Sequence, residues 1–194
     1  MNKALGITLG VILVIALWIT ASYNGFVSKQ EASNEAFANV QATYQRRADL
    51  IPNLVEVVKG YAKHESQTLE NVIAARAKAT QINISADNLT PEKISEYQKA
   101  QGELSSALGK LMAVAEAYPD LKASKNFSDL QVQLEGTENR INEARQKYNK
   151  AVKSYNTSIR SFPGAMIAST FNFEKMEMFE ADETAKEAPK VNFQ

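Results

Sequence analysis

The sequence of 194 residues contains no cysteine and a single histidine, His64, and both absences exclude chemistry. Without cysteine the chain cannot form a disulfide, a thiolate zinc site, an iron–sulfur cluster or a thiol nucleophile. One imidazole cannot supply the paired histidines of a metal site built into a helical bundle. We therefore expect no metal and no cofactor.

Net charge and turn-forming residues are also scarce. The 22 basic side chains are balanced by 22 acidic ones, and a chain without a basic excess lacks the main source of affinity for nucleic acid. With 8 glycines and 5 prolines, there is little material for the turns of a many-stranded fold. The 44% of hydrophobic residues is normal for a packed protein. The composition predicts an all-α chain without a nucleic-acid partner.

A long uncharged stretch lies near the start of the chain, from Ala4 to Ser28. Its centre, Leu5–Ile19, is almost wholly apolar, and about 20 such residues cross the ~30 Å hydrocarbon layer of a bilayer as a helix. Trp18 and Tyr23 lie at its C-terminal edge, where aromatic rings favour the headgroup layer. The pattern predicts a transmembrane helix.

We expect residues 1–25 to be a retained anchor that contacts lipid through residues 4–23. The alternative is a cleaved signal peptide, for which residues 19–21 form a poor cleavage site. Lys3 precedes the span together with the terminal amine, whereas Lys29 is the only cation that closely follows it. The positive-inside rule then places the N-terminus in the cytoplasm and the main domain outside it.

Behind the anchor, apolar residues recur at alternating spacings of four and three, which is typical of a helix packed against other helices. The register continues through Pro52, whose missing N–H predicts a kink near Ala48. We expect one bent helix over about residues 26–82. The apolar residues of its buried face are Phe26, Phe37, Val40, Tyr44, Ile51, Leu54, Val58, Tyr61 and Val72.

Two further helices are expected. One begins at the capping sequence Thr90-Pro91-Glu92 and ends at Pro119. The other runs from about residue 126 to 161 and is stopped by Phe162-Pro163-Gly164. Together the helices predict an antiparallel three- or four-helix bundle over residues 26–163, whose first helix overhangs towards the membrane.

The C-terminal segment, residues 164–194, is too apolar for a solvated tail. Its large apolar residues include Met176, Met178, Phe179, Val191 and Phe193. Residues 161–194 hold three basic and six acidic side chains, whereas residues 122–160 hold eight basic and four acidic ones. Opposite charge favours packing of this segment on the bundle near the third helix. The alternative is docking on a partner, by addition to a sheet edge.

Several blocks of the sequence resemble a known family. They are Tyr23-Asn24, Arg46-Arg47-Ala48-Asp49-Leu50-Ile51-Pro52-Asn53-Leu54-Val55, Val58-Lys59-Gly60-Tyr61, Thr137-Glu138-Asn139-Arg140-Ile141, Tyr148-Asn149, Tyr155-Asn156 and Ala188-Pro189-Lys190-Val191-Asn192-Phe193. In this order they resemble the LemA family of bacterial membrane proteins over essentially the whole chain, with Asn192 where that family often has Asp.

The resemblance implies one N-terminal helix in the bacterial cytoplasmic (inner) membrane and an α-helical domain beyond it. It implies no established catalytic residue. An envelope membrane protein, such as a membrane protease, is the kind of partner that it implies.

Charged side chains occupy several positions of the expected buried faces, among them Arg47, Glu65, Glu138 and Arg145. A buried charge needs a partner, and antiparallel threading places the third helix beside the second half of the first. We predict a cross-helix layer of Glu65, Glu138 and Arg145 that fixes helix register, with Arg76 near the far end of the bundle.

Pro52 leaves the carbonyl of Ala48 without its helical partner, so nearby donors are expected to satisfy it. The polar residues around this position are Arg46, Arg47, Asp49 and Asn53. Support of the helix bend is one interpretation of this group, and a subunit contact is the other.

The first helix is expected to extend beyond its bundle partners and to expose apolar side chains in a monomer. These side chains are Phe26, Phe37, Val40 and Tyr44. An exposed stripe of this kind normally marks an interface. We therefore predict a homo-oligomer that forms through the membrane-proximal part of the helix.

No catalytic motif is present. Glu65 and Glu138 with His64 come nearest to an acid–base set, but adjacent helical residues diverge by about 100°, so His64 and Glu65 cannot share a pocket. The sequence has no phosphate-binding loop and no nucleophile motif. We predict a non-enzymatic, membrane-anchored scaffold that organises or supports envelope proteins. The alternative is an envelope sensor or adaptor that binds a partner through the bundle or the C-terminal segment.

Overall fold

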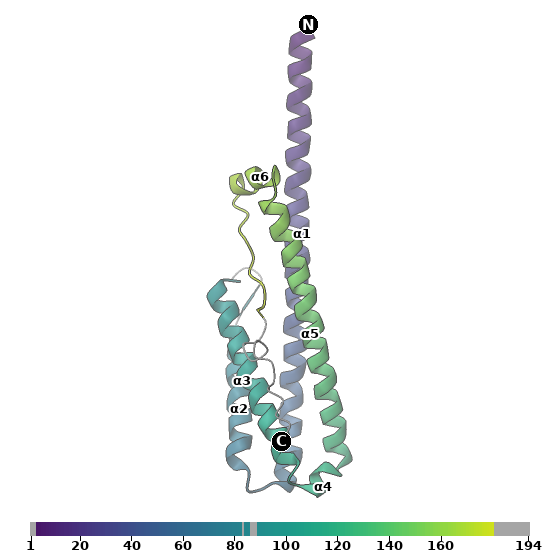
Figure 1. Ribbon diagram of the computed structural model, residues 1–194, viewed down its shortest axis with the longest axis vertical. Helices are drawn as coiled ribbons and strands as arrows, with labels where there is room; N and C mark the ends of the chain where they lie inside the picture. Colours follow the sequence, from purple (N-terminus) through teal and green to yellow (C-terminus); the bar gives the residue numbers. More distant parts are fainter. Residues whose placement is uncertain (1–2, 83, 86–88, 181–194) are drawn as a thin grey trace, which may run out of the picture.

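The computed structural model describes residues 3–82, 84–85 and 89–180, and this part of the chain is built from helices (Figure 1). They are α1 (Lys3–Tyr61), α2 (Ser66–Gln81), α3 (Pro91–Ala115), α4 (Pro119–Lys122), α5 (Lys125–Arg160) and α6 (Gly164–Thr170). No strand occurs among the described residues, which confirms the all-α prediction.

Each long helix runs antiparallel to the one before it, so α1, α2, α3 and α5 form an up-and-down bundle (Figure 1). The helix α5 lies along α1, and the α2–α3 hairpin packs against the half of α1 remote from the N-terminus. The N-terminal part of α1 projects beyond the bundle as a single helix. The first helix was expected to extend beyond its bundle partners, and α1 does so.

The prediction of one helix over residues 26–82 is wrong, because the chain reverses at residues 62–65. Ala62 N donates to Val58 O at 2.8 Å and closes the last turn of α1. The connection takes four residues, close to one helical turn, so the four-three register passes through it unchanged. Spacing along the sequence therefore could not show the reversal.

Burial explains why the reversal is favoured over a longer helix. On the return path α2 buries Leu69 and Val72 in the cluster that α1 and α3 also line. As a straight continuation of α1, the same side chains would have no helix beside them, and removal of such side chains from water stabilises a fold by about 1.5–3 kcal/mol each.

The helix α1 continues through Pro52, and the carbonyl that Pro52 leaves without a helical N–H finds another donor. Arg76 Nε, from α2, donates to Ala48 O at 2.7 Å. A donor was expected here, but it comes from the neighbouring helix rather than from the polar residues beside Pro52. The bond ties α2 to α1 at the position of the missing hydrogen bond.

The starts of the later helices follow their capping residues. Thr90 caps α3 by accepting a hydrogen bond from Lys93 N at 3.3 Å, and Pro91 occupies the first turn. The observed α5 agrees with the expected third helix to within one residue at each end. After it, a cis peptide bond joins Phe162 to Pro163, and α6 begins.

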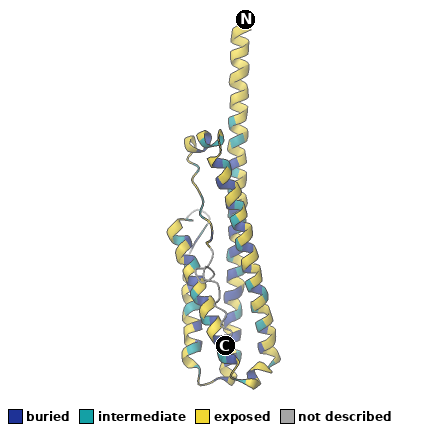
Figure 2. Ribbon diagram, in the orientation of Figure 1, coloured by how far each residue is buried: buried dark blue, intermediate teal, exposed yellow. Residues whose placement is uncertain are grey.

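Three clusters of buried apolar side chains follow one another along α1. Figure 2 shows that the buried residues of α1 lie in the part of the helix beside the rest of the bundle. The cluster farthest from the N-terminus joins α1 with α2, α3 and the start of α5. The middle cluster centres on Phe37, Val40 and Tyr148, and Phe179 packs into it. The third contains Phe26, Tyr155 and Ile167, so α6 is part of the core.

Within the described residues, α1 is the one helix long and apolar enough to cross a membrane, with a mean hydropathy of 2.4 over its most apolar window. None of that window is buried inside the protein. The helix is unbroken across the predicted boundary between residues 25 and 26. Val191 and Phe193, which were expected to pack on the bundle, lie outside the described residues.

The contact between Arg76 and the Ala48 carbonyl predicts a coupling between Arg76 and Pro52. Arg76→Met in the native chain should lower the free energy of unfolding by about 1–2 kcal/mol, because a helix carbonyl loses a charged donor. In a Pro52→Ala background the loss should be clearly smaller, since the new N–H of residue 52 supplies the missing bond.

Denaturant unfolding in detergent of the native, single and double variants measures this coupling. Lys78→Met on the same helix is the control, because Lys78 forms an exposed ion pair with Glu103 and should cost little in either background. Equal losses for Arg76→Met with and without Pro52 would contradict the assignment.

Candidate functional site

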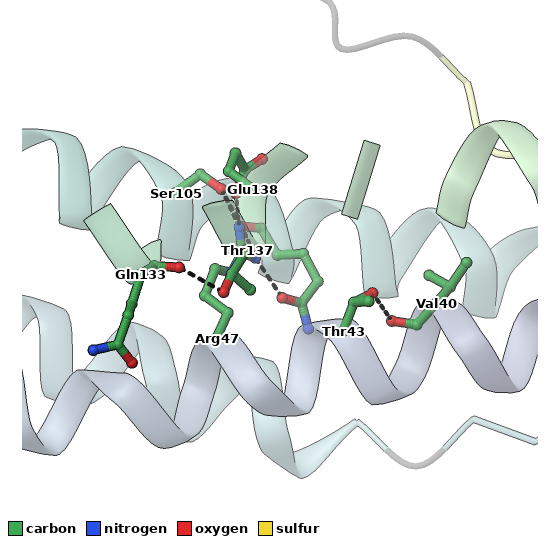
Figure 3. A network of polar contacts seen from close by, with 8 residues as sticks. Val40, Thr43, Arg47, Ser105, Gln133, Thr137 and Glu138 are labelled. Atoms are coloured by element: carbon green, nitrogen blue, oxygen red, sulfur yellow. Dashed lines mark hydrogen bonds and ion pairs between the residues drawn. The ribbon is translucent and has the colours of Figure 1, made fainter. Parts of the chain in front are cut away.

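Arg47 lies inside the bundle with 2% of its surface exposed, and its guanidinium joins three helices. Nη1 donates to Ser105 Oγ of α3 at 2.8 Å and to Glu138 Oε2 of α5 at 2.9 Å (Figure 3). Nη2 donates to Gln101 Oε1 of α3 at 2.7 Å. A planar fork with several fixed donors is suited to such a contact.

We call Arg47 and its three partners, Gln101, Ser105 and Glu138, the Arg47 layer. One of these partners extends the contacts to the fourth helix. Gln101 Nε2 donates to Ala79 O of α2 at 3.4 Å. The guanidinium also lies over the Tyr44 ring, 5.2 Å from its centre. Arg47 Nε is buried with no hydrogen-bond partner within the described part of the chain. That this layer fixes helix register rather than adding large net stability stays a prediction.

The prediction that Glu65, Glu138 and Arg145 form one layer is wrong in its members. Glu138 pairs with Arg47, whereas Glu65 accepts a hydrogen bond from the Tyr118 hydroxyl at 3.1 Å. Glu65 is too far along the bundle to join Arg47. From Arg47 to Tyr61 the helix α1 rises about 21 Å, and Glu65 lies in the connection that follows, at the far end of the bundle.

Arg145 lies at a different contact, near the end of the described chain. Its Nη2 donates to the main-chain oxygen of Glu180 at 2.7 Å, and its guanidinium lies 5.5 Å from the centre of the Phe179 ring. The sequence indicated that Arg145 needed a partner, and both of these contacts are to the C-terminal segment.

The polar residues around Pro52 point mostly to solvent. Arg46, Asp49 and Asn53 are exposed, and Asp49 Oδ1 accepts a hydrogen bond from Gln45 Nε2 on the preceding turn. They do not supply the donor to the Ala48 carbonyl. Their other interpretation, a subunit contact, stays a prediction.

The apolar stripe on α1 is covered within the monomer, so the expectation of an exposed stripe is wrong. The exposed fractions are 5% for Phe26, 1% for Phe37, 0% for Val40 and 5% for Tyr44. The covering groups come from α3, α5, α6 and residues 173–180. We call residues 173–180 the docked segment. Homo-oligomerisation through this stripe loses its structural basis.

Two asparagines on α5 hold the docked segment through its main chain. Asn156 exchanges two hydrogen bonds with the backbone of Met176, at 2.8 and 2.9 Å. Asn149 does the same with Phe179, at 2.9 Å for both bonds. The two asparagines are seven residues apart, two turns of one helix face. The described part of the C-terminal segment therefore packs along α5, the helix with the basic excess.

The tyrosine that precedes each asparagine donates a further hydrogen bond to the main chain of the docked segment. Tyr155 OH donates to Glu174 O at 2.9 Å, and Tyr148 OH donates to Glu177 O at 2.8 Å. Burial raises the pKa of the Tyr148 hydroxyl well above its ordinary value, and the charge of Glu177 raises it further. Burial is also the main cause of the raised pKa of Tyr155.

A cleft opens between α3 and α5 above the Arg47 layer. Its cavity volume is about 580 Å³, and it is lined on α3 by polar and small residues such as Ser106. Its charged lining residues are Arg47, Lys99, Glu138 and Arg145. One edge meets the docked segment, because Gln98 Nε2 and Arg145 Nη2 both donate to Glu180 O. The cleft therefore presents both signs of charge on a polar surface.

Comparison with known proteins places this arrangement in a family. The model of the LemA family matches residues 36–193, most of the chain. The chain belongs to the LemA family. Among its relatives is Protein LemA of Metamycoplasma hominis, 25% identical over 160 residues, which cover 82% of this chain and 69% of that protein.

Two further relatives carry the name magnetosome protein. MamQ of Magnetospirillum gryphiswaldense is 24% identical over 176 residues, and MamQ 2 of Paramagnetospirillum magneticum is 26% identical over 175 residues. Each alignment covers 81% of this chain and 64% of the relative. The LemA-family chain thus spans less than two thirds of the length of these MamQ proteins.

Sequence reasoning missed the partners of the key residues in this LemA-family chain. Gln101 and Ser105 were not singled out, and Asn149 and Asn156 were noted only as parts of family blocks. A signal was present: the dipeptide Tyr-Asn recurs after seven residues on a helix that was expected to be amphipathic. For a metal site the described part of the chain offers no group of three His, Asp or Glu side chains.

The Arg47 layer predicts different costs for its two charged members. Arg47→Lys should lower the free energy of unfolding by about 2 kcal/mol, because a lysine lacks the fork and leaves buried Gln101 Oε1 without its donor. Glu138→Gln should cost less than about 1 kcal/mol, because 47% of the Glu138 side chain is exposed. Denaturant unfolding in detergent measures both; equal losses would contradict the ranking.

The raised pKa of Tyr148 predicts a loss of stability in alkali. An unfolded tyrosine ionises near pH 10, whereas the folded hydroxyl keeps its proton to higher pH, so stability is full below about pH 10 and falls as the pH rises further. Tyr148→Phe should lower the unfolding midpoint at neutral pH and flatten its fall above about pH 10. Tyr61→Phe, at an exposed tyrosine, should change neither; an unchanged alkaline slope in Tyr148→Phe would refute the assignment.

Proposed function

We propose that this LemA-family chain is a membrane-anchored, non-enzymatic helical scaffold that organises or supports other proteins of the bacterial envelope. The observation that carries the proposal is the continuity of α1 from Lys3 to Tyr61. One helix holds both the apolar membrane-length segment and the buried face of the bundle. Such a helix sets the position of the bundle relative to the bilayer, which serves placement of partners rather than turnover of a substrate.

The chemistry of the described side chains also supports a role without catalysis. The buried guanidinium of Arg47 is engaged by Gln101, Ser105 and Glu138 and is not free to contact a substrate. The strongly raised pKa values belong to tyrosines whose hydroxyls are buried among structural partners. Glu65 is held by Tyr118 at the end of the bundle, so no acid–base pair forms with Glu138.

The α3–α5 cleft is the docking surface that we assign to the scaffold. It is open, most of its lining residues are polar, and they include Lys99 and Glu138, which suits a charged segment of another protein. Self-association stays a prediction, and with the α1 stripe covered it would need the cleft or another exposed face. The proposed orientation has the N-terminus in the cytoplasm and the bundle outside the inner membrane, following Lys3.

An adaptor function is the second candidate, and the docked segment favours it. Residues 174–180 are held mainly through main-chain atoms, and recognition of this kind accepts other extended peptides. A partner peptide that replaces the docked segment would expose Phe179 and the α1 stripe. The protein would then signal through the segment rather than through the cleft.

Site-specific photo-crosslinking in intact cells separates these functions. A benzophenone amino acid is placed at Ser106 in the cleft, at Met178 in the docked segment, or at Val132 on the outer face of α5, which is 65% exposed and serves as control. The scaffold proposal expects a discrete adduct with another envelope protein from position 106 and none from position 132.

The other outcomes are equally specific. An adduct from position 178 alone supports the adaptor instead, and an adduct of twice the chain mass from position 106 assigns the cleft to self-association. Absence of any adduct from positions 106 and 178 would contradict both functions. Release of the chain from membranes by an alkaline carbonate wash would contradict the anchor itself.

A further inference from the structure

A second apolar surface lies far from the anchor in the sequence, around α6. From Ser161 to Phe173 the chain contains no charged residue. Three large side chains of this region are exposed: Phe162 by 83%, Met166 by 64% and Phe171 by 48%. Single exposed apolar residues are common, but three within one short uncharged segment mark a surface that meets an apolar phase.

The α6 region is fixed against α1 just after its apolar stretch. The Tyr23 ring lies 5.1 Å from the Phe171 ring, edge to face, and 5.4 Å from the Phe173 ring. Gly164 permits the close approach of α6, because a Cβ at this position would lie 2.7 Å from Ser158 O and 3.1 Å from the Phe26 ring. The position of α6 along α1 is therefore set by packing.

That position coincides with the expected edge of the bilayer. A helix that enters the hydrocarbon layer after Lys3 crosses ~30 Å in about 20 residues and leaves it near Tyr23. The contacts of α6 with α1 are at Ile19, Tyr23 and Phe26. In Figure 1, α6 lies across the direction of α1, beside the point where α1 leaves the bundle. Figure 2 shows that much of α6 is exposed.

Basic side chains lie on the bundle side of this apolar surface. Lys153, Arg160 and Lys175 line a groove of about 340 Å³ together with Thr157 and Ser161, and Lys175 Nζ also pairs with Glu177 Oε1 at 3.0 Å. Arg160 is the last residue of α5, directly before the uncharged segment. Apolar side chains followed by cations match the order of acyl chains and headgroup phosphates at a membrane surface.

From these contacts we infer that α6 and its flanking residues form a second membrane contact, in which Phe162, Met166 and Phe171 enter the acyl–headgroup boundary and Lys153 and Arg160 face the lipid phosphates. This inference rests on the proposed membrane anchor. The two contacts together fix the tilt and depth of the bundle, because a single helix crossing a bilayer leaves both free. The occupant of the surface is the lipid bilayer itself.

Tryptophan fluorescence in vesicles tests the contact, since Trp18 is the only tryptophan of the chain. Full-length protein is reconstituted in phosphatidylcholine–phosphatidylglycerol vesicles whose acyl chains are plain or brominated. Native Trp18 reports on the anchor. In a Trp18→Phe background, Met166→Trp and Phe162→Trp report on the α6 surface, and Val132→Trp on exposed α5 is the control. Circular dichroism confirms that each variant keeps its helix content.

We expect brominated lipid to reduce the emission of Met166→Trp and Phe162→Trp at least about two-fold and to leave Val132→Trp unchanged. If Trp18 is quenched while both α6 reporters are not, the inference is overturned and the anchor stands. If none of the three positions is quenched, both the anchor and the inference fail. Blue-shifted but unquenched emission at positions 162 and 166 would assign the surface to protein contact and also overturn the inference.

Discussion

The arrangement of the whole chain depends on one apolar stripe on α1, which must be covered over its length from Phe26 to Val58. No single partner covers all sides of it. The helix α5 lies along it, the α2–α3 hairpin covers the half remote from the N-terminus, and the docked segment with α6 covers the membrane-proximal half. Because removal of apolar surface from water is the dominant favourable term in folding, this demand explains why the chain reverses after Tyr61 and why an extended segment returns along α5. The stripe that was expected to form an oligomer contact is instead buried within one chain.

Polar contacts then select one register among the packings that the stripe allows. The Arg47 layer connects all four bundle helices at one level. Arg76 joins α2 to α1 at the carbonyl that Pro52 leaves without a partner, and Asn149 and Asn156 set the position of the docked segment at two points. Each contact uses a side chain that can meet its partner only in one alignment, because a shift by one residue would leave a buried donor or acceptor unpaired. Residues 46–55 thus bring a buried arginine and a helix proline to neighbouring turns.

Membership of the LemA family and the continuity of α1 together favour a function of placement. Buried tyrosines and amides hold the bundle together, and two of its open surfaces are the α3–α5 cleft and the uncharged apolar segment near the anchor. These two surfaces suit different phases. The cleft, with charges of both signs, suits another protein, whereas the α6 surface, with its apolar tip and basic border, suits lipid. A scaffold needs both kinds of surface if it is to hold a partner at a defined height above a membrane.

The sequence by itself determined the helical class, the position of the apolar N-terminal segment, the caps of α3 and the end of α5, because these depend on local spacing, capping residues and hydropathy. It also indicated that Arg47, Glu138 and Arg145 needed partners, and that the carbonyl of Ala48 needed a donor. Only the tertiary structure decided which groups met: Glu138 with Arg47, Arg145 with the Glu180 carbonyl, and Ala48 with Arg76. The reversal at residues 62–65 was hidden because a connection of one helical turn preserves the register of the buried face, and the contact of Arg76 with Ala48 depends on that reversal.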